Sequence, residues 1–141
     1  MTEPNAHEGG CLCGAIRYRV TGAPTWSVVC HCRTCRKAAG APSLAWAIFR
    51  AEDFAFTRGE LATFASSPGV ERGFCARCGT TLTYASADRT DVADVTAASL
   101  DDPDAFAPDR EIWLDEKIGW EAVDHARARY PRSSRTSEPL P

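Results

Sequence analysis

Seven cysteines in three short groups constrain this 141-residue chain more than any other feature. The groups are Cys11-Leu12-Cys13, Cys30-His31-Cys32-Arg33-Thr34-Cys35 and Cys75-Ala76-Arg77-Cys78. Because seven is odd, disulfides within the chain cannot pair every thiol. The first residues, MTEPNAHEGG, also lack the basic and apolar stretches of a secretory signal. We therefore expect a cytoplasmic protein with reduced thiols, whose cysteines serve a purpose other than disulfide bonding.

Length and composition limit the class of protein. The chain suits one domain, and its 44% hydrophobic and 25% charged residues are typical of globular proteins. No apolar run reaches the roughly 18 residues of a membrane helix. A net charge of -3 and a pI near 5.6 argue against a general nucleic-acid binder. We expect a flexible lead-in at 1–8, one domain at 9–130 and a disordered, Ser-, Pro- and Arg-rich tail at 131–141.

Short β-like runs separated by turn residues follow one another along the chain. We expect strands at 15–20, 26–29, 43–49, 54–57, 61–65, 70–74, 80–84, 92–97 and 111–114. Residues 43–49 are apolar enough for a strand buried on both faces, and 54–57 with 61–65 are typical of a hairpin. A short helix is expected at 34–39, ending at Gly40, and another at 119–130. The pattern predicts a mainly β domain with at most one or two short helices.

The first and third cysteine groups share a feature that favours one common metal site. Each is followed directly by glycine, which permits a left-handed turn that points backbone N–H groups at sulfur. Thiolates spaced C-x-C or C-x-x-C can reach one zinc ion in pairs. The sequence therefore predicts a structural zinc site of Cys11, Cys13, Cys75 and Cys78. The alternatives are buried apolar cysteines, or a redox dithiol, which usually lies in a βαβ context that is absent here.

The middle group offers three thiolates, those of Cys30, Cys32 and Cys35, and no obvious fourth ligand. Three protein ligands with one open position are typical of a catalytic zinc. The alternatives are three structural thiols, or a site closed by a distant side chain. In an extended C-H-C segment neighbouring side chains point opposite ways, so His31 is expected to pack behind the site rather than bind metal. His7 and His125 are expected at the surface.

Cations and aromatic residues supply candidates for substrate binding. Arg33, Arg36 and Lys37 lie close to the middle group, where they would lower thiol pKa values and attract an anionic substrate. The alternative is a solvated basic turn. Aromatic side chains can form the walls of a pocket, although ordinary core packing is the alternative for each. The candidates for such walls are Trp46, Phe49, Trp113 and Trp120.

The order and spacing of these motifs resemble the glutathione-dependent formaldehyde-activating enzyme (GFA) family, which includes centromere protein V. The resemblance covers about residues 9 to 125. It rests on Gly9-Gly10-Cys11-Leu12-Cys13-Gly14-Ala15, on Cys30 to Lys37 with Gly40, on Ser66-Ser67-Pro68-Gly69 and Arg72 to Thr80, and on Ile112-Trp113 with Lys117 and Trp120.

The resemblance implies a zinc-stapled, Mss4-like β-sheet domain with two Zn²⁺ ions per chain. By position, the closed site matches Cys11, Cys13, Cys75 and Cys78. The second zinc would take Cys30, Cys32 and Cys35, with its open position facing a small thiol substrate. The implied activity is that of a carbon–sulfur lyase, the reversible joining of glutathione and formaldehyde to S-hydroxymethylglutathione.

Two departures from the family pattern bear on the substrate rather than on the metals. Arg110 stands where a histidine is expected before the Ile-Trp pair, and residues 124–127 replace a proline-containing ending. Two other functions remain open from sequence: a non-catalytic zinc module that binds a protein partner, and a thiol sensor or metal carrier. The three-ligand site favours the enzyme, because a purely structural module needs no open coordination position.

Overall fold

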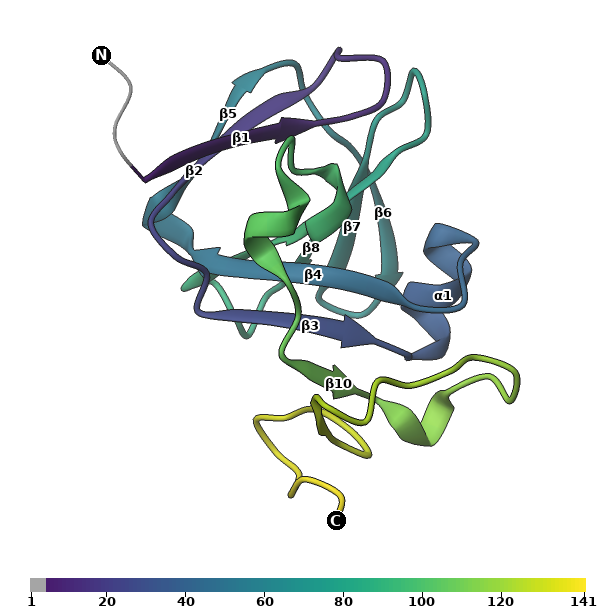
Figure 1. The fold of residues 1–141 in the computed structure, drawn as a ribbon. Helices are drawn as coiled ribbons and strands as arrows, with labels where there is room; N and C mark the ends of the chain where they lie inside the picture. The colour runs from purple at the N-terminus through teal and green to yellow at the C-terminus, as the bar shows by residue number, and fades with distance from the viewer. Residues whose placement is uncertain (1–4) are drawn as a thin grey trace.

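Strands in two sheets carry the fold of residues 5–141, the part of the chain that this computed structural model describes (Figure 1). The smaller sheet is antiparallel and contains β1 (Ala6–Gly10), β2 (Arg17–Thr21) and β5 (Phe54–Arg58). The larger sheet has the order β11 (Ala128–Arg129), β10 (Arg110–Ile112), β3 (Trp26–Cys30), β4 (Leu44–Arg50), β9 (Val92–Thr96), β8 (Thr81–Ser86), β7 (Val70–Phe74) and β6 (Ala62–Ser67). The prediction of a mainly β domain is confirmed.

The predicted helix after the middle cysteine group is confirmed as α1 (Arg33–Ala39). The side chain of Cys32 accepts a hydrogen bond from the Cys35 amide at its start, and Gly40 ends it with a left-handed φ of 62°. Four short 3-10 helices are η1 (Ala51–Asp53), η2 (Ala97–Ser99), η3 (Pro103–Phe106) and η4 (Leu114–Glu116). Among the described residues, no helix is long and apolar enough to cross a membrane.

The helix predicted at 119–130 is wrong, since this described segment is loop that leads into β11. The end of the segment bonds to the chain at β10: the amides of Ala128 and Tyr130 donate to the carbonyls of Asp109 and Glu111 over 3.2 Å and 2.9 Å. Both neighbours of β10 run parallel to it, β11 on one side and β3 on the other. The end of the chain therefore builds one edge of the larger sheet.

The hairpin predicted from 54–57 and 61–65 is also wrong, although both strands exist. β5 pairs with β2 in the smaller sheet, whereas β6 pairs with β7 in the larger one. Between them Gly59 has a left-handed φ of 74°, and a Cβ there would lie 2.2 Å from the carbonyl oxygen of Ala15. This close approach directs the chain across from one sheet to the other.

β4 separates two groups of buried side chains, as expected for a strand that is covered on both faces. Ala47 and Phe49 pack with Tyr18 and other residues between the two sheets. Trp46 and Ile48 face the other way and pack with the middle cysteines. The second group lies where α1 and the end of β3 meet, so packing places this cysteine group beside an aromatic wall.

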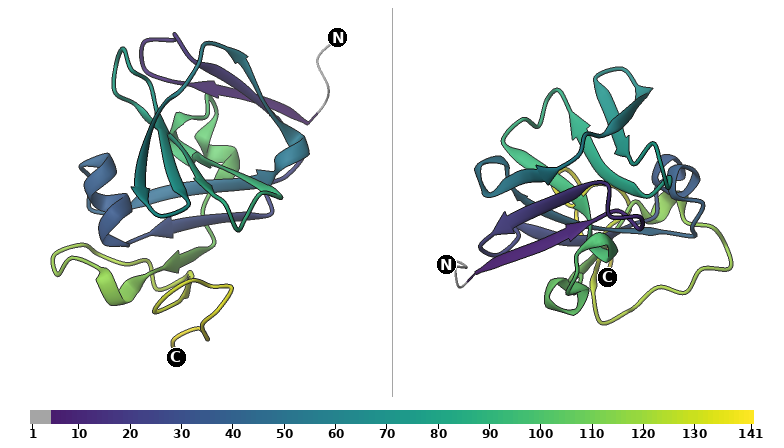
Figure 2. Two further views of the ribbon diagram at one scale, coloured as in Figure 1. Left: turned by 180° about the vertical axis from the view of Figure 1, so that it is seen from behind. Right: turned by 90° about the horizontal axis from the view of Figure 1, so that it is seen from above.

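The N-terminal end of the described chain carries a strand that the sequence did not indicate. β1 begins at Ala6, inside the expected lead-in, of which residues 1–4 lie outside the described part. His7 lies on β1 with its ring edge-on to Phe106 at 4.8 Å, instead of standing free at the surface. The segment 131–141 runs next to β10, on the side away from β1 (Figure 2). The division at residues 8 and 130 stays a prediction.

Candidate functional site

The first and third cysteine groups meet where the turn before β2 lies against the turn between β7 and β8. The sulfurs of Cys11, Cys13, Cys75 and Cys78 all lie within 4.8 Å of one another. The Cys11 and Cys13 sulfurs are 3.6 Å apart, and those of Cys13 and Cys75 are 3.8 Å apart. Cys11 and Cys75 are buried, whereas Cys13 is exposed. The cluster therefore ties residue 11 to residue 78 at one edge of the molecule.

Backbone amides surround these four sulfurs. The amide of Ile16 donates to the Cys11 sulfur over 3.2 Å, and that of Arg77 donates to the Cys75 sulfur over 3.4 Å. The predicted left-handed glycines are confirmed, with φ values of 78° at Gly14 and 81° at Gly79. The hydroxyl of Thr80, 3.2 Å from the Cys78 sulfur, lowers the pKa of that thiol to about 5. These donors favour thiolate, the form that binds metals.

The middle group is local in sequence and lies at the junction of β3 and α1. Cys30 ends β3, Cys32 caps α1 and Cys35 lies in its first turn, with the three sulfurs within 4.8 Å of one another. Hydrogen bonds from the Cys30 and Cys35 thiols lower the pKa of Cys32 to about 2, and the Cys35 amide also donates to it. The same pairing raises the pKa of Cys30. One thiolate is thus held by two thiols, and a divalent cation would allow all three to ionise.

Arg72, on β7, brings a positive charge to this cysteine triplet. Its Nη1 is 3.5 Å from the Cys35 sulfur, and its Nη2 donates to the Thr34 hydroxyl over 3.0 Å. The guanidinium also lies 5.1 Å from the centre of the Tyr84 ring. Although the side chain is buried, it forms no ion pair with a carboxylate within residues 5–141. Its charge is therefore free to balance negative sulfur.

His31 does not join the three sulfurs but takes part in a buried hydrogen-bonded chain behind them. Its Nε2 lies 2.8 Å from one carboxylate oxygen of Glu111, and Nη1 of Arg127 donates to the other over 2.6 Å. His31 and Glu111 are each 1% exposed. Within the described residues, Nδ1 of His31 has no hydrogen-bond partner. Glu111 and Arg127 thus link β10 and the loop after it to the C-H-C segment.

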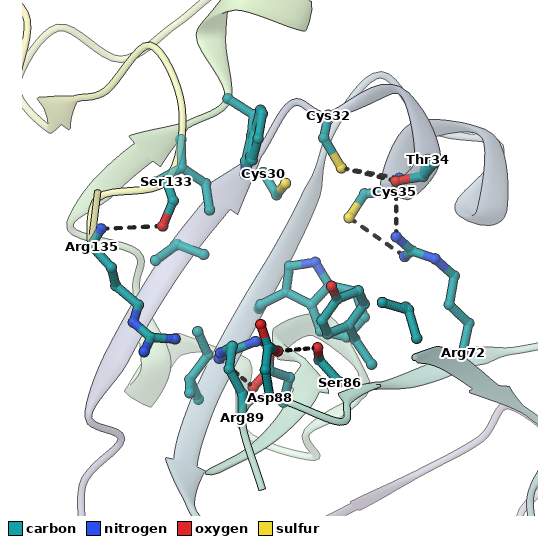
Figure 3. A pocket seen from close by; sticks show the side chains of 18 of the residues that line it. Cys30, Cys32, Thr34, Cys35, Arg72, Ser86, Asp88, Arg89, Ser133 and Arg135 are labelled. Atoms are coloured by element: carbon teal, nitrogen blue, oxygen red, sulfur yellow. Dashed lines mark hydrogen bonds and ion pairs between the residues drawn. The ribbon is translucent and has the colours of Figure 1, made fainter. Parts of the chain in front are cut away.

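A cavity of about 720 Å³ opens beside the triplet (Figure 3). All three cysteines line it, together with an apolar wall that includes Trp46, Ile112 and Trp113. Figure 3 shows Asp88 and Arg89 at the end away from the sulfurs, and Ser133 and Arg135 along one side. The volume is in the range of small-molecule sites.

Sequence reasoning placed only part of this cavity. Trp46 and Trp113 line it, but Phe49 packs in the other core and Trp120 is 77% exposed. The cations proposed to contact substrate, Arg33, Arg36 and Lys37, are not among the lining residues. The guanidinium groups at the cavity come from positions that are distant in sequence and were not proposed as substrate cations, namely Arg72, Arg89 and Arg135. Only the pairing of β7, β8 and β9 with β4 brings the first two of these near the triplet.

The two sheets and two cysteine clusters define a mainly β, Mss4-like domain with two candidate metal centres. Residues 6–116 match the family described as glutathione-dependent formaldehyde-activating enzyme, and the chain belongs to this family.

Two curated relatives and one solved structure are similar to the chain. It is 29% identical over 111 residues to an uncharacterized lyase of Schizosaccharomyces pombe, covering 79% of this chain and 80% of that protein. It is also 29% identical over 143 residues to a Halomonas elongata protein named "Putative glutathione-dependent formaldehyde-activating enzyme", covering 90% of each. A crystal structure of a Rhodobacter sphaeroides protein, 23% identical, superposes with a TM-score of 0.57 over 67% of this chain and 87% of that one. That likeness shows the fold alone.

Proposed function

We propose that this chain is a zinc-dependent enzyme that forms or breaks a carbon–sulfur bond in a small thiol adduct. The reaction expected from its family is the joining of glutathione and formaldehyde to S-hydroxymethylglutathione. The observation that carries the proposal is that Cys30, Cys32 and Cys35 converge and also line the cavity. Three protein sulfurs beside a cavity leave room for a substrate atom in a fourth position.

The donor sets of both clusters fit zinc. Thiolate sulfur is a ligand that Zn²⁺ prefers, at about 2.3 Å in tetrahedral geometry, so two ligand sulfurs lie about 3.8 Å apart. The sulfur separations of 3.6 Å and 3.8 Å in the four-cysteine cluster agree with that spacing. We assign Cys11, Cys13, Cys75 and Cys78 to a structural zinc, and Cys30, Cys32 and Cys35 to a second zinc.

The proposed reaction adds a thiol to an aldehyde. The sulfur–hydrogen bond breaks, a sulfur–carbon bond forms, and a proton ends on the former carbonyl oxygen; the reverse reaction returns both reactants. A zinc ion at such a site can bind the substrate thiol as thiolate or polarise the oxygen. Trp46 and Trp113 would exclude water and orient the adduct, while Arg72 balances the negative charge of the sulfurs.

Exchange spectroscopy with formaldehyde and glutathione tests the proposal. We expect the metal-loaded protein to raise the exchange rate between free and adduct forms above the uncatalysed rate. Cys30→Ser should return it to the uncatalysed rate, because one ligand of the second zinc is lost. Leu12→Ala is a matched control, since this side chain is 89% exposed beside the other cluster. Equal exchange rates for the wild type and Cys30→Ser would remove the lyase function.

A further inference from the structure

The segment after residue 130 forms part of the cavity wall, although it lies beyond the residues that match the family. Its backbone is hydrogen-bonded to the segment after β10: the amide of Trp113 donates to the carbonyl of Arg132 over 3.1 Å, and that of Leu114 donates to the carbonyl of Tyr130 over 3.1 Å. Ser133, Ser134 and Arg135 line the cavity beside Trp113. A segment expected to be a disordered tail thus contributes to the candidate active site.

A tight turn within this segment orients Arg135. The amide and hydroxyl of Ser137 both donate to the Ser133 carbonyl, over 3.0 Å and 2.6 Å. The Arg135 amide donates to the Ser133 hydroxyl over 3.2 Å. Figure 3 shows the Arg135 side chain extending from this turn along the cavity toward Asp88 and Arg89. The turn therefore directs a guanidinium at the end of the cavity away from the cysteines.

The charges at that end leave Arg135 available for a ligand. Arg89 forms a two-bond ion pair with the buried Asp94, over 3.1 Å and 3.2 Å. The carboxylate of Asp88 accepts a hydrogen bond from the hydroxyl of Ser86. The guanidinium of Arg135 makes no ion pair or hydrogen bond with any residue in 5–141, although its charge acts on both carboxylates. The cavity thus has thiols at one end and an unpaired cation at the other.

We propose that Arg135 is a specificity-determining residue that binds a carboxylate of the substrate while the substrate sulfur lies at the cysteine triplet. The inference rests on the proposed function for the identity of the reacting group. Guanidinium binds carboxylate through two parallel hydrogen bonds, which fix orientation as well as charge. The substrate class is therefore an acidic thiol, with its carboxylate several bonds from sulfur, in preference to neutral or cationic thiols.

Binding of a thioether that cannot react tests the proposal without requiring catalysis. The probe is S-methylglutathione, titrated into the full-length, metal-loaded protein and followed by calorimetry. We expect Arg135→Gln to weaken binding at least about tenfold, because the charge and the two parallel hydrogen bonds to the carboxylate are lost. Arg135→Lys should recover part of the affinity, because it keeps the charge and loses the two-bond geometry.

The matched control is Arg132→Gln, which removes the same charge from the same segment. The Arg132 side chain is 70% exposed, pairs with Asp115 over 3.6 Å and does not line the cavity. We expect less than about a twofold change in affinity for this variant. The diethyl ester of the probe should bind the wild type and Arg135→Gln alike. Three results would overturn the proposal: equal loss of affinity in the two arginine variants, a loss of ester affinity in Arg135→Gln as large as that for the free acid, or no binding of the probe by the wild type.

The exchange assay separates this inference from the proposed function. If the probe binds and depends on Arg135 while formaldehyde exchange is absent, the acidic ligand site stands and the lyase function fails. If exchange depends on Cys30 while Arg135→Gln and Arg132→Gln have the same KM, the lyase function stands and the role of Arg135 is wrong. A rise in KM for glutathione with unchanged kcat in Arg135→Gln supports both.

Discussion

The two cysteine clusters offer the same ligand atom, sulfur, but one draws its sulfurs from distant segments and the other from a single short segment. The four-cysteine cluster joins turns 62 positions apart in sequence and is surrounded by backbone amides. The triplet lies within one short segment, Cys30 to Cys35, and is surrounded by side chains such as Arg72 and Thr34. A metal that joins distant segments stabilises the folded chain, whereas a local cluster can give up a coordination position to a ligand. The difference supports our proposal that the four-cysteine cluster serves folding and the triplet serves chemistry.

The largest effect should come from breaking the four-cysteine cluster. Metal binding that couples to folding is worth about 10 kcal/mol or more, so Cys78→Ser should unfold the domain. Cys30→Ser should lose one metal ion and remain folded, because β3 and α1 stay joined by the chain. Native mass spectrometry, elemental analysis and circular dichroism of anaerobically purified protein measure this difference.

The expected stoichiometry is two zinc ions for the wild type and one for Cys30→Ser. A single zinc in the wild type, or unfolding in both variants, would contradict the division into a structural and an open site.

The second effect concerns Glu111, whose carboxylate joins His31, beside the triplet, to Arg127. Removing one partner from a buried ion pair costs about 3 kcal/mol, because the remaining charges lose their compensation. We expect Glu111→Gln to lower the free energy of unfolding by about this amount, measured by urea denaturation. Glu71→Gln is the control, since the same change at an exposed position should cost less than about 0.5 kcal/mol. Equal midpoints for the two variants would show that the buried hydrogen-bonded chain of His31, Glu111 and Arg127 does not stabilise the fold.

Arg72 should affect the metal at one cluster and not at the other. Outer-shell substitutions typically lower metal affinity about 10- to 100-fold, and we expect this for the triplet in Arg72→Gln. The four-cysteine cluster should keep its metal, because its sulfurs accept hydrogen bonds from backbone amides and the Thr80 hydroxyl and not from Arg72. Competition with a chromophoric chelator measures both sites. Arg77→Gln, an exposed change inside the other cluster, is the control, and equal loss at the triplet in the two variants would contradict the assigned role.

The smallest effect lies on the four-cysteine side, at the exposed pair of Arg17 and Asp101. The Arg17 guanidinium donates to this carboxylate over 3.0 Å and lowers the pKa of Asp101. The folded state therefore gains stability above the ordinary aspartate pKa of about 3.9 and loses it as the pH falls through the lowered value. Since the side chains are 30% and 54% exposed, Asp101→Asn should cost less than about 1 kcal/mol at pH 7.

The pH dependence is the check on that assignment. The difference in unfolding free energy between the wild type and Asp101→Asn should shrink toward zero below about pH 4. A difference that stays constant with pH would show that the charge of Asp101 contributes nothing.

Local signals in the sequence predicted most of the secondary structure and the meeting of two cysteine groups. The glycines after Cys13 and Cys78 were informative because a left-handed turn beside a metal-ligand pair strongly restricts the residue type. Short β-like runs bounded by turn residues predicted β3, β4, β7, β8 and β9, because strand formation depends on such local patterns. β1 was missed because two of its five residues are glycines, one of which packs against the Tyr18 ring.

The cavity depended on long-range pairing that no local signal encodes. Nothing in the local sequence marks Arg72, Arg89 and Arg135 as cations of one cavity. Strand order brings Arg72 and Arg89 to it, and the turn at Ser133 brings Arg135. The failed hairpin has the same origin: Gly59 marks a turn, but its contact with Ala15 decides which strands pair. Charge near a motif in sequence was a poor guide, since α1 carries Arg33 and Lys37 away from the cavity.

The parallel pairing of β10 with β3 and β11 has a consequence for how the molecule is made. Parallel neighbours require a long connection, so this edge of the sheet cannot form until residues 110–129 have been synthesised. The four-cysteine cluster, in contrast, takes all four of its sulfurs from residues up to Cys78. If the proposed structural zinc binds there, it can bind during translation, before the residues that carry Arg135 have been synthesised. We therefore expect the scaffold around the four cysteines to fold before the cavity beside the triplet is complete.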